Sequence, residues 1–381
     1  MRNLRGKVIL VRCDFSVPII GKKVIDDFKI VKSLPTIRLL TSQGAKVVLI
    51  THLGRPNGKK SKKFILNPIC AKLSVLLGKK VRYIDDVIGL RAKNAVKALK
   101  DGQIILLDNL RFYKGEEKND ENFAKKLANL ADIYVNNAIA VSHRRHASVA
   151  AIKKFLPSYA GLLLEEEIIS LQKALRPKKP LVLVIGGSKI ETKVPVVKSL
   201  KKKASFILVG GMISHDFLAA KKFSTGKYKV SQEAKKMAKS ILSRKIILPV
   251  DFVTATGKKG DGDIKVYSAK DLKQSVWQFD IGPETIRLYS RYLKKAKTII
   301  WNGPMGMFEN DHFKHGTLAI ARVVASVSSG KAFGVVGGGE TVSALKQTKM
   351  LDYVDWISTG GGAMLAYLAG DKMPGLEGLV N

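Results

Sequence analysis

The chain has 381 residues, 46% of them hydrophobic, and this length indicates two domains rather than a single core. No apolar run approaches the roughly 18 residues of a membrane span, and the first residues contain no apolar signal segment, so we expect a cytoplasmic protein without a membrane partner. Only two cysteines occur, Cys13 and Cys70, which argues against a disulfide framework and against a structural zinc site.

The charge balance is strongly basic, with 67 Lys+Arg, 31 Asp+Glu and a formal net charge of +36. A chain with this charge is expected to associate with polyanions at low salt. The lysines stand in small groups over the whole length, and no pattern of a known nucleic-acid-binding motif accompanies them. We therefore predict no specific nucleic-acid partner.

Short apolar runs alternate with amphipathic helical stretches, which is typical of α/β architecture with parallel sheets. The strands predicted in the first half are residues 8–11, with Cys13 placed in this first strand, 47–50, 81–84, 104–107 and 133–135. Those predicted in the second half are residues 181–185, 206–209, 246–250, 298–301, 333–336 and 356–357. Residues 159–175 have helical spacing and end before Pro177. We predict two doubly wound, Rossmann-like parallel-sheet domains joined by a hinge helix.

Residues that follow strands in the first half are polar or cationic. Ligands of open parallel sheets bind beyond the carboxyl ends of the strands, so these side chains are candidate ligand contacts. They are Asp14, Ser16, His52, Arg55, Arg111, His143, Arg144 and His146. Three arginines and up to three histidines at one edge suit a small ligand that carries both a phosphate and a carboxylate.

The stretch LVLVIGGSKIETK, residues 181–193, predicts a buried strand, a glycine turn and a helix that starts near Ile190. Such a strand, turn and helix start form an anion-binding geometry. Lys189 and Lys193 are four residues apart and are expected on one side of that helix. The stretch is interpreted as a polyphosphate cradle, with an ordinary turn and solvated lysines as the alternative.

Four more glycine-rich turns follow strands in the second half: GGM at 210–212, NGPMG at 302–306, GGGET at 337–341 and TGGG at 359–362. Repeated glycines leave room for a flat base and a polyphosphate, and they expose backbone amides to the phosphates. Two anion sites on two lobes imply phosphoryl transfer between two bound substrates, with a hinge that closes to exclude water. Neither a GxxxxGK[ST] motif nor an HRD–DFG pair occurs, so the chain is neither a P-loop kinase nor a protein kinase.

Nine motifs in order make the chain resemble phosphoglycerate kinase along nearly its whole length. They are VRCDFSVP, THLGRP, DNLRF, SHRRHAS, IGGSKIETK, DIGP, WNGPMGMFE, GGGET and ISTGGGA. The resemblance implies reversible transfer of the ATP γ-phosphate to the carboxylate of 3-phosphoglycerate, giving 1,3-bisphosphoglycerate and ADP. It also implies Mg²⁺ carried with the nucleotide, direct in-line transfer, domain closure, a role in glycolysis and gluconeogenesis, and a monomer.

The resemblance also implies the domains and their roles. Residues 1–158 would bind 3-phosphoglycerate, 159–176 would form the hinge helix, 177–369 would bind the nucleotide, and the tail 370–381 would return to the first domain. The 3-phosphoglycerate contacts implied are Asp14, Ser16, Lys29, His52, Arg55, Arg111, Arg144 and His146. The arginines among them would hold its phosphate.

Nucleotide and catalytic residues are implied in the same way. Nucleotide contacts would be Gly186, Gly187, Lys189, Lys193, Gly210, Gly211, Asn302, Pro304, Glu309, Gly337, Gly338, Gly339, Glu340 and Thr341. Glu309 would meet the ribose hydroxyls, and Glu340 would bind the metal. Lys29, Lys189, Lys193, Gly339 and Gly362 would stabilise the transferring group, with backbone amides from 337–339 and 360–362.

Three departures from the family pattern fall on these residues. Lys29 stands where the family has arginine, which keeps the charge and loses the bidentate fork. Ser16 replaces an asparagine, and Glu340 an aspartate that is also a hard oxygen ligand. Further departures are Asn137, Met212 and Trp356.

Two other functions were weighed against the kinase. One is a family member that has lost most activity and binds polyanions or nucleic acid. The arginine cluster and both lysines of GGSKIETK oppose it. The other is a nicotinamide-dependent dehydrogenase, but the chain has no GxGxxG followed by an acidic residue about 20 positions on.

Overall fold

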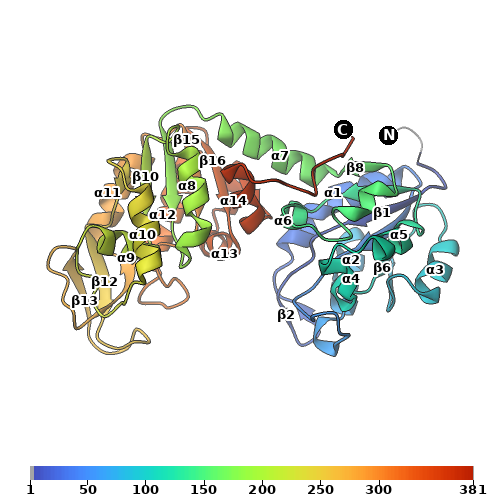
Figure 1. The fold of residues 1–381 in the computed structure, drawn as a ribbon, viewed down its shortest axis with the longest axis horizontal. Helices are drawn as coiled ribbons and strands as arrows, with labels where there is room; N and C mark the ends of the chain where they lie inside the picture. Colours follow the sequence, from blue (N-terminus) through green and yellow to red (C-terminus); the bar gives the residue numbers. More distant parts are fainter. Residues whose placement is uncertain (1–3, 381) are drawn as a thin grey trace. The chain divides into compact units, whose positions relative to one another are not determined.

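The computed structural model describes residues 4–380 and divides the chain into two compact units. Unit 1 comprises Met1–Ile168 and Lys372–Asn381, and unit 2 comprises Ile169–Asp371. The division falls inside one helix, α7 (Leu162–Leu175), drawn in green in Figure 1. Each unit contains its own six-stranded parallel sheet, which confirms the predicted α/β class.

The sheet of unit 1 has the order β5-β6-β4-β1-β7-β8, and all its strand pairs are parallel. In chain order these strands are β1 (Val8–Arg12), β4 (Lys46–Ile50), β5 (Val81–Ile84), β6 (Ile104–Leu107), β7 (Ile133–Asn136) and β8 (Ser158–Ala160). A short hairpin of β2 (Ile19–Ile20) and β3 (Lys23–Val24) accompanies them. The helices are α1 (Phe28–Ser42), α2 (Asn67–Leu77), α3 (Leu90–Lys97), α4 (Lys114–Glu117), α5 (Glu121–Ala128) and α6 (Ile139–Ser142).

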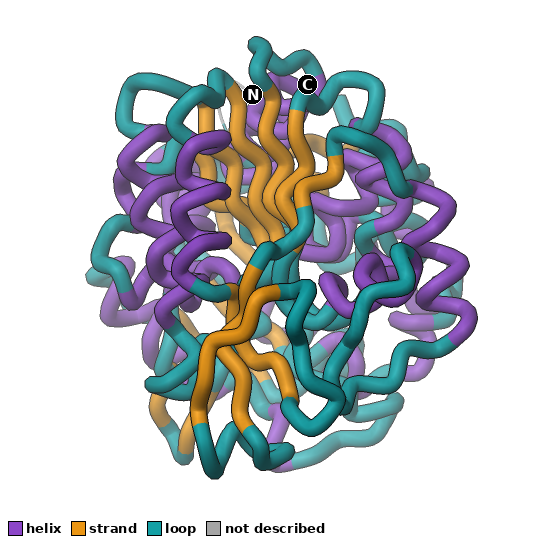
Figure 2. The backbone as a smooth tube through the Cα atoms, turned by 90° about the vertical axis from the view of Figure 1, so that its left-hand side faces the viewer, coloured by secondary structure: helices purple, strands orange, loops and turns teal. Residues whose placement is uncertain are grey.

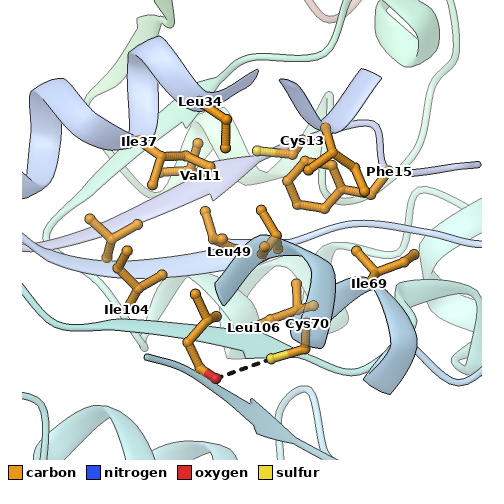
Figure 3. Close-up of a cluster of buried hydrophobic side chains, with 14 of the residues drawn as sticks. Val11, Cys13, Phe15, Leu34, Ile37, Leu49, Ile69, Cys70, Ile104 and Leu106 are labelled. Atoms are coloured by element: carbon orange, nitrogen blue, oxygen red, sulfur yellow. Dashed lines mark hydrogen bonds between the residues drawn. The ribbon is translucent and has the colours of Figure 1, made fainter. Parts of the chain in front are cut away.

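The core of unit 1 lies on both faces of this sheet. Ile9 and Val11 of β1 belong to one buried cluster, whereas Leu10 belongs to another on the opposite face. This two-sided burial explains why the strands read as continuous apolar runs rather than as alternating ones. Figure 3 shows the first cluster, in which the Cys70 thiol donates to the Val81 carbonyl at 3.3 Å. Cys13 lies just after β1 rather than within it, and its burial raises the pKa of its thiol to about 12.

The C-terminal residues belong to unit 1 and make specific backbone contacts there. The Gly375 amide donates to the Ser142 carbonyl at 2.8 Å, and the Asn136 side chain donates to the Gly375 carbonyl at 2.9 Å. Further on, the Val380 amide donates to the Ser158 carbonyl at 2.8 Å, beside β8. Figure 1 shows this segment in dark red.

The parallel sheet of unit 2 has the order β11-β10-β9-β15-β16-β17. Its strands are β9 (Leu181–Ile185), β10 (Phe206–Val209), β11 (Ile246–Ile247), β15 (Thr298–Asn302), β16 (Phe333–Gly337) and β17 (Trp356–Ser358). The helices are α8 (Val194–Leu200), α9 (Ile213–Ala220), α10 (Gln232–Ile241), α11 (Pro283–Leu293), α12 (His315–Ser328), α13 (Gly339–Gln347) and α14 (Gly361–Ala369). Single turns of 3₁₀ helix occur at Lys62–Phe64, Leu110–Phe112, Ala151–Lys154, Ile190–Thr192 and Leu351–Tyr353.

A three-stranded antiparallel sheet of β12 (Asp251–Ala255), β13 (Ile264–Ser268) and β14 (Trp277–Ile281) adds to unit 2. Figure 2 shows its strands at the lower end of the tube, below the parallel strands. The sequence did not predict this sheet, because the first three residues of β13 are exposed and form no apolar run. The strand predicted at 246–250 was too long for a related reason: β11 ends at Ile247, two residues before Pro249.

The predicted helix at 159–175 begins later, at Leu162, because Tyr159 and Ala160 form part of the unpredicted strand β8. Near residue 190 the structure also differs in detail from the prediction. A 3₁₀ turn at Ile190–Thr192 precedes α8, whose first turn contains Pro195. Proline is tolerated there because the first amides of a helix have no intrahelical acceptor.

Candidate active site

The glycine turns that follow three neighbouring strands of unit 2 interlock. The Gly187 amide donates to the Pro304 carbonyl at 2.8 Å, and the Gly211 amide donates to the Met305 carbonyl at 2.7 Å. Gly303 has a φ of +95°, and a Cβ atom at this position would lie 2.2 Å from the Gly186 carbonyl oxygen. These turns require glycine because they approach one another through their backbones.

A cavity of about 420 Å³ opens beside these turns, and its lining is suited to phosphate groups. Lys189 and Lys193 line it together with the first residues of α13 and α14. Helix N-termini present free amides and a positive dipole end to an anion. The lining residues are Gly187, Ser188, Lys189, Thr192, Lys193, Asn302, Gly303, Gly338, Gly339, Glu340, Thr341, Gly361, Gly362 and Leu365.

The two lysines of this cavity differ in environment. Lys189 is exposed, whereas Lys193 is 8% exposed and donates to the Asn302 side-chain oxygen. Burial lowers the pKa of Lys193 to about 8, against the opposing effect of the Glu340 carboxylate. The alternative of two solvated lysines therefore does not describe Lys193. An anion in the cavity would stabilise the charged form of this buried amine.

A second cavity, of about 380 Å³, adjoins the first, since Gly187, Ser188 and Glu340 line both. Its other walls include seven aromatic or sulfur-containing side chains, and Glu309 stands among them. The aromatic and sulfur-containing side chains are Met212, Tyr228, Phe252, Trp277, Phe279, Met305 and Met307, and the polar ones besides Glu309 are Ser214, His215, Lys258, Gln278 and Asp280. Flat apolar surfaces and polarisable sulfur suit a heteroaromatic ring. The two cavities together therefore suit a base at one end and phosphates at the other.

Most residues predicted for the nucleotide line these two cavities, including Pro304 and Gly211. Gly186, Gly210 and Gly337 are absent from both linings and lie where neighbours leave no room for a side chain. A Cβ atom on Gly210 would lie 2.5 Å from the Met305 sulfur, and one on Gly337 would lie 2.2 Å from the Met364 sulfur. Close packing thus accounts for these glycines.

In unit 1, a buried arginine that sequence reasoning did not single out organises the cationic residues. The Arg12 side chain is fully buried at the end of β1; it donates to the Ser148 hydroxyl at 2.9 Å and lies 3.2 Å from His52 Nδ1. The Glu116 carboxylate, also fully buried, lies 4.0 Å from Arg12 and accepts from the Ser148 hydroxyl at 2.6 Å. The position of Arg12 at the end of an apolar strand was the available signal.

Two of the three candidate histidines, His52 and His146, are neutral because of burial and the surrounding positive charge. Burial first, and then the Arg12 guanidinium, lower the pKa of His52 well below its ordinary value. The same two causes, with Arg111 and Arg144, lower the pKa of His146 to about 3. Neutral imidazoles can accept as well as donate hydrogen bonds, so the cluster contains both cationic and neutral contacts for an anion.

The remaining predicted residues of unit 1 divide into anchored and exposed ones. Arg111 donates to the Gly54 carbonyl at 2.7 Å and its Nε lies 3.1 Å from Glu117. The Arg144 Nε lies 3.3 Å from His143 Nε2. Arg55 is exposed. Burial lowers the pKa of Arg111, and the positive charges of Arg144 and Arg12 lower it further.

Asp14, Ser16 and Lys29 form a small network beside this cluster. The Lys29 ammonium donates to an Asp14 carboxylate oxygen at 2.6 Å, and the Ser16 amide donates to the other oxygen at 3.1 Å. Burial alone would raise the pKa of Asp14, but the positive charge of Lys29 and the hydrogen bonds from Lys29 and the Ser16 amide outweigh it and lower the pKa. Asp14 is therefore ionised at neutral pH.

The sequence model of the phosphoglycerate kinase family matches residues 1–371. The chain belongs to the phosphoglycerate kinase family. It is 42% identical to the phosphoglycerate kinase of Borrelia garinii subsp. bavariensis, over 98% of this chain and 96% of that protein. It is 42% identical to that of Thermosipho africanus, over 100% and 96%.

Solved structures of phosphoglycerate kinases have the same fold. The chain is similar to phosphoglycerate kinase from Pyrococcus horikoshii OT3, with a TM-score of 0.88 and 33% identity, over 99% of this chain and 96% of the other. The corresponding values for the structure from Coxiella burnetii are 0.82 and 38%, over 98% and 96%. The activity is accordingly phosphoglycerate kinase activity in glycolysis, that of an ATP-dependent phosphotransferase.

Three side chains that line the aromatic cavity were not found from the sequence. Tyr228, Phe252 and Trp277 line the aromatic cavity but lie outside the glycine-rich motifs. Two of them, Phe252 and Trp277, come from the antiparallel sheet that the sequence did not predict.

Within residues 4–380, no cluster of three or more His, Cys, Asp or Glu side chains could hold a metal, and no helix is long and apolar enough to cross a membrane.

Proposed function

We propose that unit 2 binds ATP or ADP and unit 1 binds 3-phosphoglycerate or 1,3-bisphosphoglycerate, with direct in-line transfer of the phosphoryl group to the substrate carboxylate. The observation that carries this proposal is the pair of adjoining cavities in unit 2, one aromatic and one lined by Lys193 and helix N-termini. No protein nucleophile is needed, because positioning and electrostatic stabilisation suffice for phosphoryl transfer.

In unit 2 the base would lie against Tyr228 and Trp277, with Glu309 at the ribose hydroxyls. The phosphates would extend into the adjoining cavity, where Lys189 and Lys193 neutralise their charge. Amides at the starts of α13 and α14, from Gly339 and Gly362, would donate to the transferring group. An added Cβ would meet nothing within 4 Å at either glycine, so both backbones are open to a ligand.

Mg²⁺ fits this site as a partner of the nucleotide rather than as a metal held by the protein alone. Glu340 lines both cavities and offers one hard carboxylate, and Mg²⁺ is commonly bound by one or two carboxylates plus substrate phosphates. When bound, the ion would neutralise charge that develops on the phosphate oxygens. Glu340 would orient it from the start of α13.

In unit 1 the phosphate of 3-phosphoglycerate would bind to Arg55, Arg111 and Arg144, because guanidinium groups suit phosphate geometry. Asp14, Ser16, His52 and His146 would contact the remaining hydroxyl and carboxylate groups. Arg12 would act as a positioning residue, since it is fully buried and holds His52 and Ser148. Lys29 would stabilise the phosphoryl group during transfer.

Transfer would require the two units to close around both substrates and exclude water. Small-angle scattering tests this part of the proposal. The radius of gyration should fall further with a non-transferable ATP analogue, magnesium and 3-phosphoglycerate together than with either ligand alone. No additional change with both ligands would contradict closure.

The proposal also includes a monomer, which size-exclusion chromatography with light scattering tests. It further includes a cytoplasmic location, which cell fractionation tests.

The central test is a coupled assay of ATP and 3-phosphoglycerate turnover, run on this chain and on Lys29→Arg. Turnover of about 1–100 per second, the range typical of kinases, would support the proposed roles and show that lysine is an accepted substitute. If the unaltered chain is nearly inactive and Lys29→Arg is active, the site assignment is supported and the low activity is caused by Lys29. If both proteins are silent, the proposed catalytic roles are wrong.

A further inference from the structure

A second cationic surface lies on unit 2, at the edge of the parallel sheet opposite the glycine turns. It consists of the turns that lead into five adjacent strands, β11, β10, β9, β15 and β16, and we name it the basic edge. Its cationic residues are Arg176, Lys178, Lys179, Lys201, Lys202, Lys203, Arg244, Lys245, Lys294, Lys295, Lys297 and Lys331. Figure 1 shows the chain leaving α7 through the first of these turns.

None of the five turns of the basic edge contains an acidic residue, and the nearest acids lie in the turn that leads into the sixth strand, β17. There the Asp355 carboxylate accepts from the Gly334 amide at 2.8 Å. The turns at 176–180, 201–205, 242–245, 294–297 and 329–332 include neither Asp nor Glu. Within residues 4–380, none of the ion pairs involves a cation of this edge. One cation per turn would be enough to complement the negative end of a preceding helix, yet most of these turns carry two or three. Helix capping therefore does not account for the cluster.

The corresponding edge of unit 1 is different, although the whole chain is rich in lysine. There Arg5 lies 3.3 Å from the Asp101 carboxylate, and Asp132 accepts a hydrogen bond from the Val8 amide at 2.8 Å. Acidic residues thus stand among the turns that lead into the strands of unit 1. In unit 2 such acids occur only in the turn before β17, and the five turns of the basic edge carry their cations without any acid.

Several cations of the basic edge are held in place by the backbone. The Lys203 ammonium donates to the Leu175 carbonyl at 2.7 Å, and the Lys245 ammonium donates to the Lys201 carbonyl at 2.9 Å. Lys201 in turn donates to the Leu242 carbonyl at 3.2 Å. An ammonium group has three donors, so each still has free N–H groups for a ligand. Positions fixed in advance reduce the entropy that binding would cost.

A hollow of about 510 Å³ extends the basic edge onto α12. Lys294, Arg322 and Lys331 line it with Val323, Ser326 and Val327. Across five strands spaced by about 4.8 Å, the edge is about 19 Å wide. That width matches roughly six base pairs of duplex DNA, which carries one negative charge per about 1.7 Å of axis.

We propose that the basic edge binds the phosphate backbone of nucleic acid without regard to sequence. Lysine predominates and no aromatic side chain occurs in these turns, so phosphates rather than bases are the expected contacts. An anionic membrane is the less favoured partner, because none of the large exposed hydrophobic side chains of residues 4–380 lies in these turns. The surface is separate from the proposed nucleotide site, so this inference does not depend on the proposed function.

The test compares two variants of equal charge. The edge variant combines Lys178→Gln, Lys202→Gln, Arg244→Gln, Lys294→Gln and Lys331→Gln. The control variant combines Lys79→Gln, Lys80→Gln, Lys93→Gln, Lys97→Gln and Lys100→Gln, which replace exposed lysines of unit 1. Anisotropy of a labelled 20-base-pair mixed-sequence duplex is measured between 50 and 200 mM KCl. Unchanged kinase activity of both variants in the coupled assay serves as the folding control.

Each lost phosphate contact lowers the slope of log affinity against log salt by about 0.9. In the edge variant we expect the magnitude of this slope to fall by about 3–5 and the affinity at 50 mM KCl to fall at least about tenfold. In the control variant the magnitude of the slope should fall by less than about 1. Equal losses in both variants, or no binding by the unaltered chain at 50 mM KCl, would overturn the proposal. The protein is also sedimented with phosphatidylserine vesicles in the presence of the duplex. If it stays bound to the vesicles, the partner of the basic edge is a membrane and the nucleic-acid proposal is wrong.

Discussion

The Lys29 ammonium lies 2.6 Å from a carboxylate oxygen of Asp14, whose side chain is only 6% exposed. This pair joins the first turn of α1 to the segment just after β1. Lys29 itself is 31% exposed, so its ammonium is anchored on one side and open to solvent on the other. The geometry therefore suits a cation that is held in place and still able to meet a phosphoryl group.

Removal of the Lys29 charge should impair catalysis much more than removal of a neighbouring charge. We expect Lys29→Met to lower kcat by about 10²–10³, the usual effect of losing one group that stabilises the transition state. Lys32 lies in the same helix, and its ammonium is 5.7 Å from the Phe28 ring centroid. Lys32→Met should change kcat less than about threefold. Steady-state kinetics in the coupled assay measures both, and equal losses would contradict the role given to Lys29.

Nucleotide affinity should weaken in alkaline solution because of Lys193. Burial lowers the pKa of this amine to about 8, so the unliganded protein loses the positive charge as the pH rises through that value. Calorimetric titration with ADP from pH 6.5 to 9.5 should show a constant Kd below about 8 and a rise of up to about tenfold per pH unit above it. Lys193→Arg, which stays protonated, should flatten the profile even if its affinity is lower.

The same shift predicts how stability without nucleotide changes with pH. Between about 8 and 10.5 the folded protein binds fewer protons at Lys193 than the unfolded chain does. The contribution of this residue to the free energy of unfolding therefore rises with pH over that window. In urea unfolding, the free energy of unfolding of the unaltered chain should rise relative to that of Lys193→Met as the pH increases from about 8 to 10.5. A constant difference between the two proteins, or a Kd for ADP that stays flat to pH 9.5, would argue against the shifted pKa.

Gly303→Ala should destabilise the protein more than Gly330→Ala, although both glycines have positive φ values of +95° and +102°. At Gly303 the new methyl would also meet the Gly186 carbonyl oxygen at 2.2 Å, whereas at Gly330 nothing lies within 4 Å. Backbone strain alone costs about 1–3 kcal/mol and applies to both, so the difference isolates the clash. Thermal unfolding checks the order, and equal shifts in Tm would show that the turns can move apart.

Glu116 and Glu117 are adjacent carboxylates with opposite environments, which makes them a matched pair. Glu116→Gln removes the charge beside fully buried Arg12 and should cost about 3–5 kcal/mol, because the arginine remains buried and uncompensated. Glu117 is 38% exposed beside Arg111, and Glu117→Gln should cost less than about 1 kcal/mol. Urea unfolding measures the difference, and similar costs for the two variants would contradict the buried-pair interpretation.

The parallel sheets could be predicted because burial on both faces leaves a plain signal in sequence. Ile9, Leu10 and Val11 are all fully buried, so β1 reads as an unbroken apolar run. The antiparallel sheet left no such signal, since Ile264, Lys265 and Val266 of β13 are exposed. The helical pattern of the sequence extends back over Tyr159 and Ala160, which belong to the short strand β8, because so short a strand has no clear period of its own.

The motif residues that line the cavities of unit 2 were easier to predict than the buried residues of unit 1. The glycine turns stand directly after strands, where the topology of a parallel sheet directs attention, and Lys193 lies in the motif that contains the first of them. Arg12 lies within a strand and Glu116 in a short helix, and only the three-dimensional contacts bring them together with Ser148. Pairing between residues more than a hundred positions apart has no local pattern from which a single sequence could predict it.

Unit 1 is discontinuous in sequence, so its two segments are synthesised at different times. Residues 372–381 belong to unit 1 but are synthesised after the whole of unit 2. Until they emerge, the Asn136 side chain lacks the Gly375 carbonyl, and the Ser142 carbonyl lacks the Gly375 amide. Unit 1 therefore cannot complete its fold until the whole of unit 2 has been synthesised.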